Sequence, residues 1–356
     1  MRRLNRRGFI RRSLQSGTSA AAIGSIAQSA LSAPADQEAV GGVSARAKAP
    51  RDRSDIAEHF RGPIPSLNTP FRRDGSVDYD ALRKLIDAQI AGGTKAILLT
   101  AGDSHYFCLS DEEIAEVTRA TCRHVAGRAM VIAADRQYST ARAVQFARFA
   151  RGQGADVLMC MPPDWGASCT TDTLVEHYAT VAREMSVMIV TNVFISRGME
   201  FGLKTVDLAL KRSPNIVAIK DDMVGEFGRR LAMLVRDRCK LMSGGTKQNH
   251  FDVWPYGCDC YLSTLATIAP RIAHDYWSAL EKKDLETAQR IIKEIEVPFF
   301  DYIMKLPGGF DAGIHGVLEL YGLAPRWRRK PYYSLSDAEM RQLKEFLATL
   351  KIPQPA

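Results

Sequence analysis

A lysine at the end of a short apolar run is the residue best suited to carry chemistry in this chain. The run 215–219 is rich in β-branched residues, as is typical of a buried parallel strand, and Lys220, Asp221 and Asp222 follow it. Lys220 has two possible explanations. It marks the exit of the strand into solvent, or it is an amine kept neutral and nucleophilic by desolvation where a barrel opens.

The elements that would position this lysine alternate regularly along the chain. Each predicted strand is followed by a predicted helix, and the strands are 64–71, 95–100, 129–134, 156–161, 186–193, 216–220, 240–243 and 259–265. This rhythm predicts a (β/α)8 TIM barrel over residues 59–284. A doubly wound open sheet is the alternative, but no glycine-rich phosphate-binding motif follows the first strand. Residues 285–356 are predicted to form a C-terminal helical extension.

The first 35 residues predict export. Asn5–Arg11 resembles a twin-arginine motif, and an Ala/Ser/Gly-rich stretch follows it, so we expect a signal peptide over 1–35 and a periplasmic or otherwise exported protein. A disordered basic tail is the alternative. Residues 36–58 are expected to be a flexible linker. Without the six arginines of the leader the net charge falls from +8 to +2, so no nucleic-acid partner is predicted, and the sequence holds no membrane span.

Several stretches in order resemble one known family. The segments that carry the resemblance are Thr69–Phe71, Asp74–Asp78, Leu109–Glu113, Pro214–Asp221, Ala269–Arg271 and Leu318–Gly322. Over residues 60–350 the chain resembles the dihydrodipicolinate synthase / N-acetylneuraminate lyase family of class I pyruvate-dependent aldolases. The resemblance implies a lyase that breaks carbon–carbon or carbon–oxygen bonds. In it Lys220 would form a Schiff base with a pyruvate-like or sugar-acid-derived 2-keto acid, in a dimer or tetramer without metal or other cofactor.

The sequence departs from the family pattern around this lysine. Gly102 and Asp103 occupy the positions of two hydroxyl residues that hold the keto acid's carboxylate in the family, and Ser104 could supply a substitute hydroxyl. Thr191 stands where the family has a tyrosine that shuttles a proton, and Arg197 lies next to the position of a family arginine. Since a threonine hydroxyl is too weak an acid to replace a phenol, a role in lysine biosynthesis is not expected.

These comparisons give a set of candidate site residues. Lys220 is the candidate nucleophile, and either His105 or Tyr106, on the loop after the second strand, would move protons. The candidates for substrate binding are Thr69, Gly102, Asp103, Ser104, Thr191, Asn192, Arg197, Ser243 and Ser263.

Acidic residues at the predicted strand ends leave other functions open. These are Asp103, Asp135, Asp164, Asp221 and Asp222, which either cap loops and helices or face the mouth and bind a cation. Several of them facing Lys220 would raise its pKa and oppose imine formation. The alternatives are therefore an exported family member that binds a small keto or sugar acid without catalysis, and a cation-assisted hydrolase or isomerase.

Overall fold

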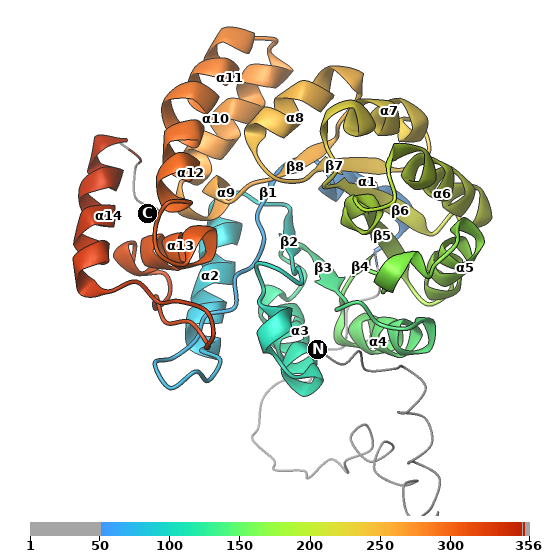
Figure 1. The fold of residues 1–356 in the computed structure, drawn as a ribbon, viewed down its shortest axis with the longest axis horizontal. Coiled ribbons are helices and arrows are strands. Elements are labelled where there is room, and N and C mark those ends of the chain that lie inside the picture. The colour runs from blue at the N-terminus through green and yellow to red at the C-terminus, as the bar shows by residue number, and fades with distance from the viewer. Residues whose placement is uncertain (1–50, 351, 353–356) are drawn as a thin grey trace, which may run out of the picture. The chain divides into compact units, whose positions relative to one another are not determined.

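Eight parallel strands form a barrel at the centre of the computed structural model, which describes residues 51–350 and 352 (Figure 1). The strands are β1 (Gly62–Ile64), β2 (Ala96–Leu98), β3 (Met130–Ala134), β4 (Val157–Cys160), β5 (Ser186–Val190), β6 (Ile216–Asp221), β7 (Lys240–Ser243) and β8 (Cys260–Leu262). Neighbours pair in sequence order, and β8 pairs with β1. A hydrogen bond of 2.8 Å from the Leu67 N–H to the Leu98 carbonyl closes the remaining gap. The predicted TIM barrel is confirmed.

Helices cover the outside of the barrel. They are α2 (Tyr79–Ala91), α3 (Asp111–Val125), α4 (Thr140–Gln153), α5 (Thr171–Val181), α6 (Met199–Arg212), α7 (Gly225–Val235), α8 (Lys247–Val253), α9 (Leu265–Ile268) and α10 (Pro270–Glu281). Local sequence sets their ends and faces. Ser110 and Glu113 form a capping box that starts α3, and Leu82, Leu85 and Ile86 give α2 a buried apolar stripe. The strands are therefore covered on both sides, which explains why they are continuous apolar runs.

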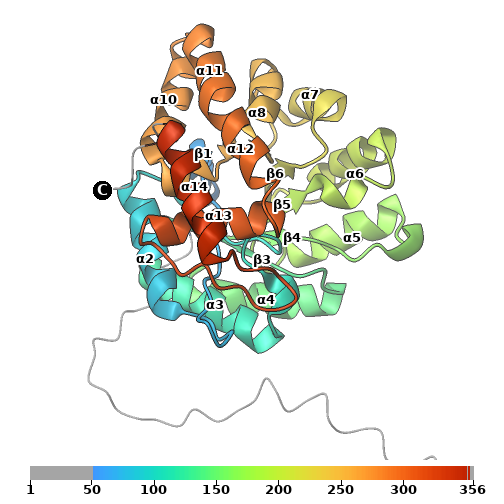
Figure 2. The same cartoon turned by 60° about the vertical axis from the view of Figure 1, so that its left-hand side comes forward.

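Further helical segments follow the barrel (Figure 2). They are α11 (Leu285–Ile291), a π-helical turn (Ile292–Glu296), α12 (Val297–Ile303), α13 (Gly309–Leu320) and α14 (Asp337–Thr349). The segment between α13 and α14 returns to the barrel, because the Arg329 guanidinium donates to the carbonyls of Gly75 and Cys108 at 2.9 and 2.8 Å. The C-terminal extension therefore contacts the loops that leave β1 and β2.

Several boundaries differ from the sequence-based expectation. The fifth strand, expected over 186–193, ends at Val190, and the eighth, expected over 259–265, is regular only over Cys260–Leu262. The first strand, expected over 64–71, is regular only over Gly62–Ile64, since Pro65 and Pro70 have no N–H to donate to a ladder. The expected linker over 36–58 ends in helix α1 (Arg53–His59), which Asp52 caps and which buries Ile56. The expected signal peptide over 1–35 lies outside the described residues.

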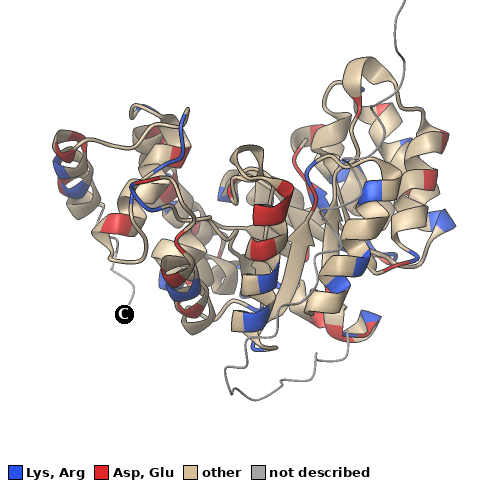
Figure 3. Cartoon of the chain, turned by 90° about the horizontal axis from the view of Figure 1, so that it is seen from below, with Lys and Arg blue, Asp and Glu red and all other residues tan. Residues whose placement is uncertain are grey.

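Charge is mixed on the surface of the described residues. Acidic and basic residues are interspersed along the helices seen in Figure 3. This distribution differs from the one-sided basic surface that binds nucleic acid. No helix in the described part of the chain is long and apolar enough to cross a membrane.

Candidate functional site

Lys220 lies near the end of β6, at the carboxyl ends of the barrel strands. It is buried, and its register partners are Val190 of β5 and Met242 of β7. The next residue, Asp221, faces outward, because its Oδ2 lies against Gly228 of α7. Side chains alternate along a strand, so the Lys220 side chain faces the barrel interior. This is the end of a TIM barrel at which catalytic groups are found.

The Lys220 amine is paired with one carboxylate. Its Nζ donates a hydrogen bond to Oδ1 of Asp222, and the Lys220 side chain is 8% exposed against 23% for Asp222. Oδ2 of Asp222 has no hydrogen-bond partner among the described residues. The amine therefore has a proton acceptor in contact with it, and that acceptor has one free oxygen.

The turn after β6 is held by Thr191, the first residue after β5. Its Oγ1 donates to Oδ1 of Asp221 at 3.0 Å and accepts the N–H of Asp222 at 2.8 Å and of Met223 at 3.3 Å. Burial raises the pKa of Asp221, although the hydrogen bonds that its carboxylate accepts from Thr191 and from the N–H groups of Met223 and Val224 oppose the shift. Thr191 and Asp221 thus fix the backbone that directs Asp222 back toward the amine.

Gly244, directly after β7, makes room for the Asp222 carboxylate. Its N–H donates to the Asp221 carbonyl at 2.7 Å. A β-carbon at this position would overlap Oδ1 of Asp222 and lie 2.7 Å from the Asp221 carbonyl oxygen. A glycine is therefore required at 244 for the carboxylate to reach Lys220.

The loop after β2 brings a second carboxylate toward the amine. The Asp103 side chain is partly buried. Burial raises the pKa of Asp103, with Ser66 and the Lys220 charge opposing the shift. Asp103 is therefore close enough to interact with the charge of Lys220, but it forms no ion pair with the amine.

His105 belongs to a separate cluster around Arg328. Its Nε2 lies 2.5 Å from Oδ1 of Asp311 and in hydrogen-bond contact with the Arg328 guanidinium. The same guanidinium donates to Oδ2 of Asp311 at 2.9 Å and lies 3.2 Å from Nδ1 of His315. We call these four residues the arginine cluster. Two histidines and an aspartate are a possible donor set for a metal. The guanidinium contacts all three, however, so a metal could bind there only if Arg328 moved away.

Charges within the arginine cluster stabilise each other. Burial raises the pKa of Asp311, but the hydrogen bond from His105 and the charge of Arg328 outweigh it and hold that pKa well below its usual range. Burial, followed by the Arg328 charge, lowers the pKa of His315 far below its ordinary value. Asp311 is thus held ionised and His315 neutral around a buried arginine.

Comparison with known proteins agrees with this geometry. The model of the dihydrodipicolinate synthetase family matches residues 59–350. The chain belongs to this family. A 4-hydroxy-tetrahydrodipicolinate synthase from Psychrobacter sp. is 31% identical over 247 residues, which cover 68% of this chain and 80% of that protein.

Two further relatives differ in the activity that they are named for. A protein of Streptomyces avermitilis named "Probable 5-dehydro-4-deoxyglucarate dehydratase 2" is 26% identical over 293 residues, covering 81% of this chain and 87% of its own. The structure of dihydrodipicolinate synthase from Bacillus clausii superposes with a TM-score of 0.73 at 23% identity, covering 83% of this chain and 99% of that one. As a member of this family of synthases, dehydratases and lyases, the chain is a lyase-type enzyme of the aldolase class.

Most of the predicted hydroxyl residues of this family member join loops to one another. Thr69 donates to the Ser104 carbonyl at 2.7 Å, and the Ser104 hydroxyl donates to the Leu67 carbonyl at 2.6 Å. Ser243 and Ser263 are buried at the ends of β7 and β8. Gly102 and Asn192 are exposed on the loops after β2 and β5.

Two predicted residues point to other partners than the amine. The Tyr106 side chain is buried beside Thr118 and Cys122 of α3, and burial raises the pKa of its phenol. Arg197 donates to Oδ2 of Asp164 at 2.6 Å and lies 3.9 Å above the ring centre of Phe201. Within the described residues, neither makes a hydrogen bond to Lys220 or Asp222.

The five strand-end aspartates also separate. Asp164 pairs with Arg197, Asp221 binds Thr191, and Asp135 accepts the N–H of Met161 at 2.8 Å. Burial raises the pKa of Asp135 to about 7. Only two of the five, Asp103 and Asp222, have contacts or charge interactions with Lys220. These contacts do not favour a cation site shared by all five.

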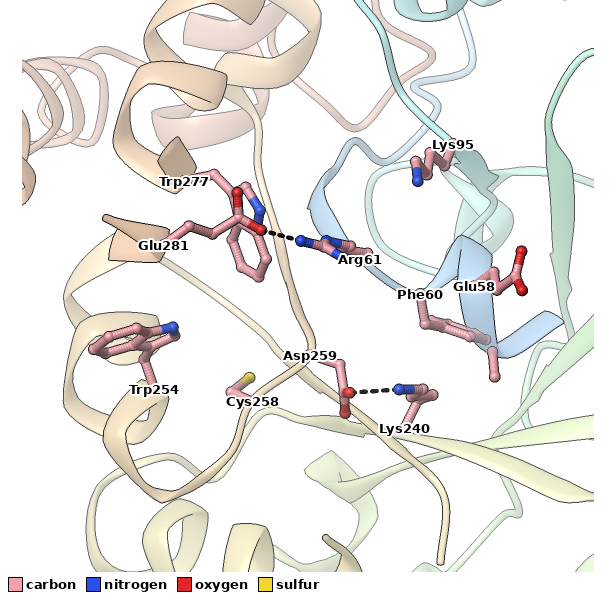
Figure 4. A pocket seen from close by; sticks show the side chains of 11 residues that line it. Glu58, Phe60, Arg61, Lys95, Lys240, Trp254, Cys258, Asp259, Trp277 and Glu281 are labelled. Carbon is pink, nitrogen blue, oxygen red and sulfur yellow. Dashed lines mark hydrogen bonds and ion pairs between the residues drawn. The ribbon is translucent and has the colours of Figure 1, made fainter. Parts of the chain in front are cut away.

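A cavity of about 630 Å³ lies at the opposite, amino-terminal end of the strands (Figure 4). Trp254 and Trp277 contribute to its wall. Its charged groups include two ion pairs, Arg61 with Glu281 at 2.5 Å and Lys240 with Asp259 at 2.7 Å. No candidate site residue lines it, and this end of a TIM barrel usually serves stability.

Sequence reasoning missed the partners in the arginine cluster. Asp311, His315 and Arg328 are separated from His105 by more than 200 positions, and nothing in their local sequence marks them. The role of Asp222 had a weak local signal, since it lies two residues after the lysine, on a strand end where the chain can turn back.

Proposed function

We propose that this protein is a Schiff-base-forming lyase that acts on a 2-keto acid of pyruvate-like or sugar-acid-derived structure, with Lys220 as the nucleophile. The observation that carries the proposal is the position of the Lys220 amine: buried, inside the barrel, at the carboxyl end of β6, and in contact with a carboxylate. A neutral amine in this position attacks the keto carbon and loses water to form an iminium. The iminium draws electrons from the adjacent carbon, so a bond to that carbon can be broken.

Asp103 and the exposed loop residues Gly102 and Asn192 surround the mouth in this proposal and contact the rest of the substrate. Arg197 is already paired with Asp164, and the hydroxyls of Thr69 and Ser104 donate to carbonyls, so we assign the keto acid's carboxylate to backbone N–H groups of the loops after β1 and β2. True lysine biosynthesis is not proposed, because Thr191 has its hydroxyl engaged by Asp221 and two backbone N–H groups.

Borohydride trapping tests the proposal. The protein is incubated with pyruvate and with a panel of larger 2-keto acids, reduced with borohydride and weighed by mass spectrometry. The expected result is one stable adduct per chain on the peptide that contains Lys220. Lys220→Ala abolishes the adduct, whereas Lys240→Ala, at the other end of the neighbouring strand, keeps it. A wild-type protein that forms no adduct with any keto acid of the panel would overturn the proposal.

A binding protein without catalysis is the second candidate. The observation that favours it is the environment of the expected proton carriers, since His105 is bound within the arginine cluster and Tyr106 faces α3. This function predicts that a keto acid raises the melting temperature of wild type and of Lys220→Arg equally, without turnover in either. Turnover that depends on Lys220 dismisses it.

Export and assembly are part of the same proposal. We propose that the twin-arginine-type leader delivers the folded protein beyond the inner membrane, where it forms a dimer or tetramer. Replacement of Arg6 and Arg7 by lysine should leave the protein in the cytoplasmic fraction, with its borohydride adduct intact. Light scattering on the mature protein measures the assembly.

A further inference from the structure

We infer that Asp222 is the proton carrier of this site: it takes the proton from the Lys220 ammonium and later exchanges a proton with the carbon next to the iminium. The inference rests on the proposed Schiff-base function and adds the group that the reaction needs besides the lysine. It makes Asp222 a catalytic residue, because its Oδ1 touches the reacting nitrogen.

The contact geometry of Asp222 fits this role. Oδ1 accepts a hydrogen bond from the amine, and Oδ2 is without a partner among the described residues. The side chain is 23% exposed, so it is accessible to a substrate that enters the mouth. One oxygen can therefore hold the nitrogen while the other reaches the neighbouring carbon of the bound keto acid.

The backbone is built to hold this carboxylate in place. Thr191 accepts the Asp222 N–H, and Gly244 leaves the space that the carboxylate fills. Val224, two residues after Asp222, adopts φ +54°, which is costly for a β-branched residue. Its N–H donates to Oδ1 of Asp221 at 3.3 Å, which helps to hold this strained turn. Strained backbone held by its surroundings is common where a side chain is positioned for chemistry.

The other candidate proton carriers do not contact the amine. The Thr191 hydroxyl donates to Asp221 and accepts two N–H groups, so it has no free proton to exchange. His105 contacts Asp311 and Arg328, and Asp103 forms no ion pair or hydrogen bond with Lys220 among the described contacts. Among the described acids and bases, Asp222 is the one in hydrogen-bond contact with Lys220.

The proton count of the reaction closes with these two residues. As the substrate displaces water, the ammonium proton moves to Asp222, leaving a neutral amine and a carboxylic acid. The amine adds to the keto carbon, and after a proton shift from nitrogen to oxygen the product is a neutral carbinolamine. Asp222 then gives its proton to the carbinolamine hydroxyl, which leaves as water while the nitrogen lone pair forms the C=N bond of the iminium.

Asp222, again a carboxylate, next removes a proton from the carbon adjacent to the iminium. The C–H electron pair forms a C=C bond, and the C=N pair returns to nitrogen, which gives a neutral enamine. The pair of residues carries the same net charge before attack and in the iminium state, so Asp222 also stabilises the cation that forms at nitrogen. The reverse steps release Lys220.

Exchange of hydrogen for deuterium tests this inference without knowledge of the second substrate. Pyruvate, or whichever keto acid of the panel is trapped, is followed by NMR in heavy water, where enzyme-bound enamine exchanges the protons next to the keto group. Asp222→Asn should lower the exchange rate by about 10²–10⁴-fold. Asp252→Asn, a surface acid paired with Arg229, should leave it unchanged. Exchange by Asp222→Asn within threefold of wild type overturns the inference.

Trapping separates this inference from the proposed function. Wild type without any adduct contradicts the Schiff base itself. An adduct in wild type together with full exchange in Asp222→Asn leaves the Schiff base intact and contradicts only the role of Asp222. Faster trapping and faster exchange in Asp222→Asn would mean that the carboxylate restrains the amine, which also overturns the inference.

Two further variants separate proton transfer from a structural role. Asp222→Gly removes the carboxylate, and added formate should restore part of the exchange, because a small carboxylate can occupy the space that is left. Gly244→Ala keeps both Lys220 and Asp222 but places a methyl group where the carboxylate lies, so its exchange rate should fall too. No formate rescue, combined with wild-type exchange in Gly244→Ala, would contradict the inference.

Discussion

Two cation–carboxylate groups at the same end of the barrel differ in how fully their hydrogen bonds are used. The Arg328 guanidinium donates to both oxygens of Asp311 and contacts His105 and His315, and its side chain is fully buried. Lys220 has one carboxylate partner, Asp222, which is partly exposed and has a free oxygen. Both oxygens of the Asp311 carboxylate are therefore engaged, whereas one oxygen of Asp222 is open to a substrate.

Whether a carboxylate oxygen is left free distinguishes a reactive site from a structural one more reliably than the types of the residues do. Two histidines, an aspartate and an arginine are the more suggestive set of side chains, yet the guanidinium engages both oxygens of the carboxylate and contacts both histidines, although Nε2 of His315 has no hydrogen-bond partner among the described residues. The contacts of Arg328 with Asp311 and His105 hold elements together, namely the loop after β2, helix α13 and the segment before α14. Lys220 and Asp222 have free capacity, so the chemistry is expected there.

The largest effect on stability should follow from breaking the arginine cluster. Arg328→Met leaves the Asp311 carboxylate, which is 22% exposed, without the buried guanidinium that contacts both of its oxygens, so the free energy of unfolding should fall by about 3 kcal/mol. Asp222→Asn, at the open pair, should change it by less than about 1 kcal/mol. Urea denaturation of both variants measures the contrast.

Arg329→Met is a matched control, since this neighbour pairs with Glu113 nearer the surface and should cost about 1 kcal/mol or less. Equal losses in Arg328→Met and Asp222→Asn would remove the distinction between the two sites.

The positions of Lys220 and Asp222 at the strand end could be predicted from the sequence. The apolar run before Lys220 and the eight strand–helix units place that lysine at the carboxyl end of a barrel strand. Such periodicity is a property of the local sequence, so it can be recognised without knowledge of tertiary contacts. The strand-end position of Asp222 follows in the same way, although its return toward the amine depends on Thr191 and Gly244 from the two neighbouring strands.

The arginine cluster could not be predicted from the sequence. Its members come from the loop after β2 and from the C-terminal extension, and only the folded chain brings them together. A loop histidine next to a barrel mouth is typical of an acid–base residue, and this pattern predicted a catalytic role for His105 from the sequence. The φ of +60° at His105 and its contact with Arg328 depend on long-range packing, which no local pattern reports.

A smaller effect should appear as pH dependence of the arginine cluster. Burial and the Arg328 charge keep His315 neutral in the folded protein, whereas the unfolded chain takes up a proton below pH about 6.5. This histidine therefore contributes stability that is present above that pH and is lost as the pH falls, by about 2 kcal/mol at pH 5. Asp311 has a lowered pKa, so its contribution is lost only below pH about 4.

Urea denaturation of wild type and His315→Gln at pH 7 and pH 5 measures this contribution. Wild type should lose more stability between the two pH values than the variant does. His177 and His250, whose pKa values burial lowers to about 4 and about 3, act in the same direction in both proteins and cancel in the difference. An equal loss in wild type and variant would show that His315 is protonated in the folded cluster.

The smallest effect on deuterium exchange should come from substitution of His105. The size of this effect decides whether His105 is a structural member of the arginine cluster or a catalytic proton carrier. Asparagine tolerates the positive φ at this position and keeps a polar group for Asp311, so His105→Asn should lose about 1–2 kcal/mol of stability. Its deuterium exchange per folded molecule should stay within about threefold of wild type, because the proton carrier at Asp222 is untouched. A fall of about 10²-fold or more, at wild-type adduct yield, would instead make His105 the group that moves protons. The arginine cluster would then be part of the reactive site, because Asp311 and Arg328 would position that histidine.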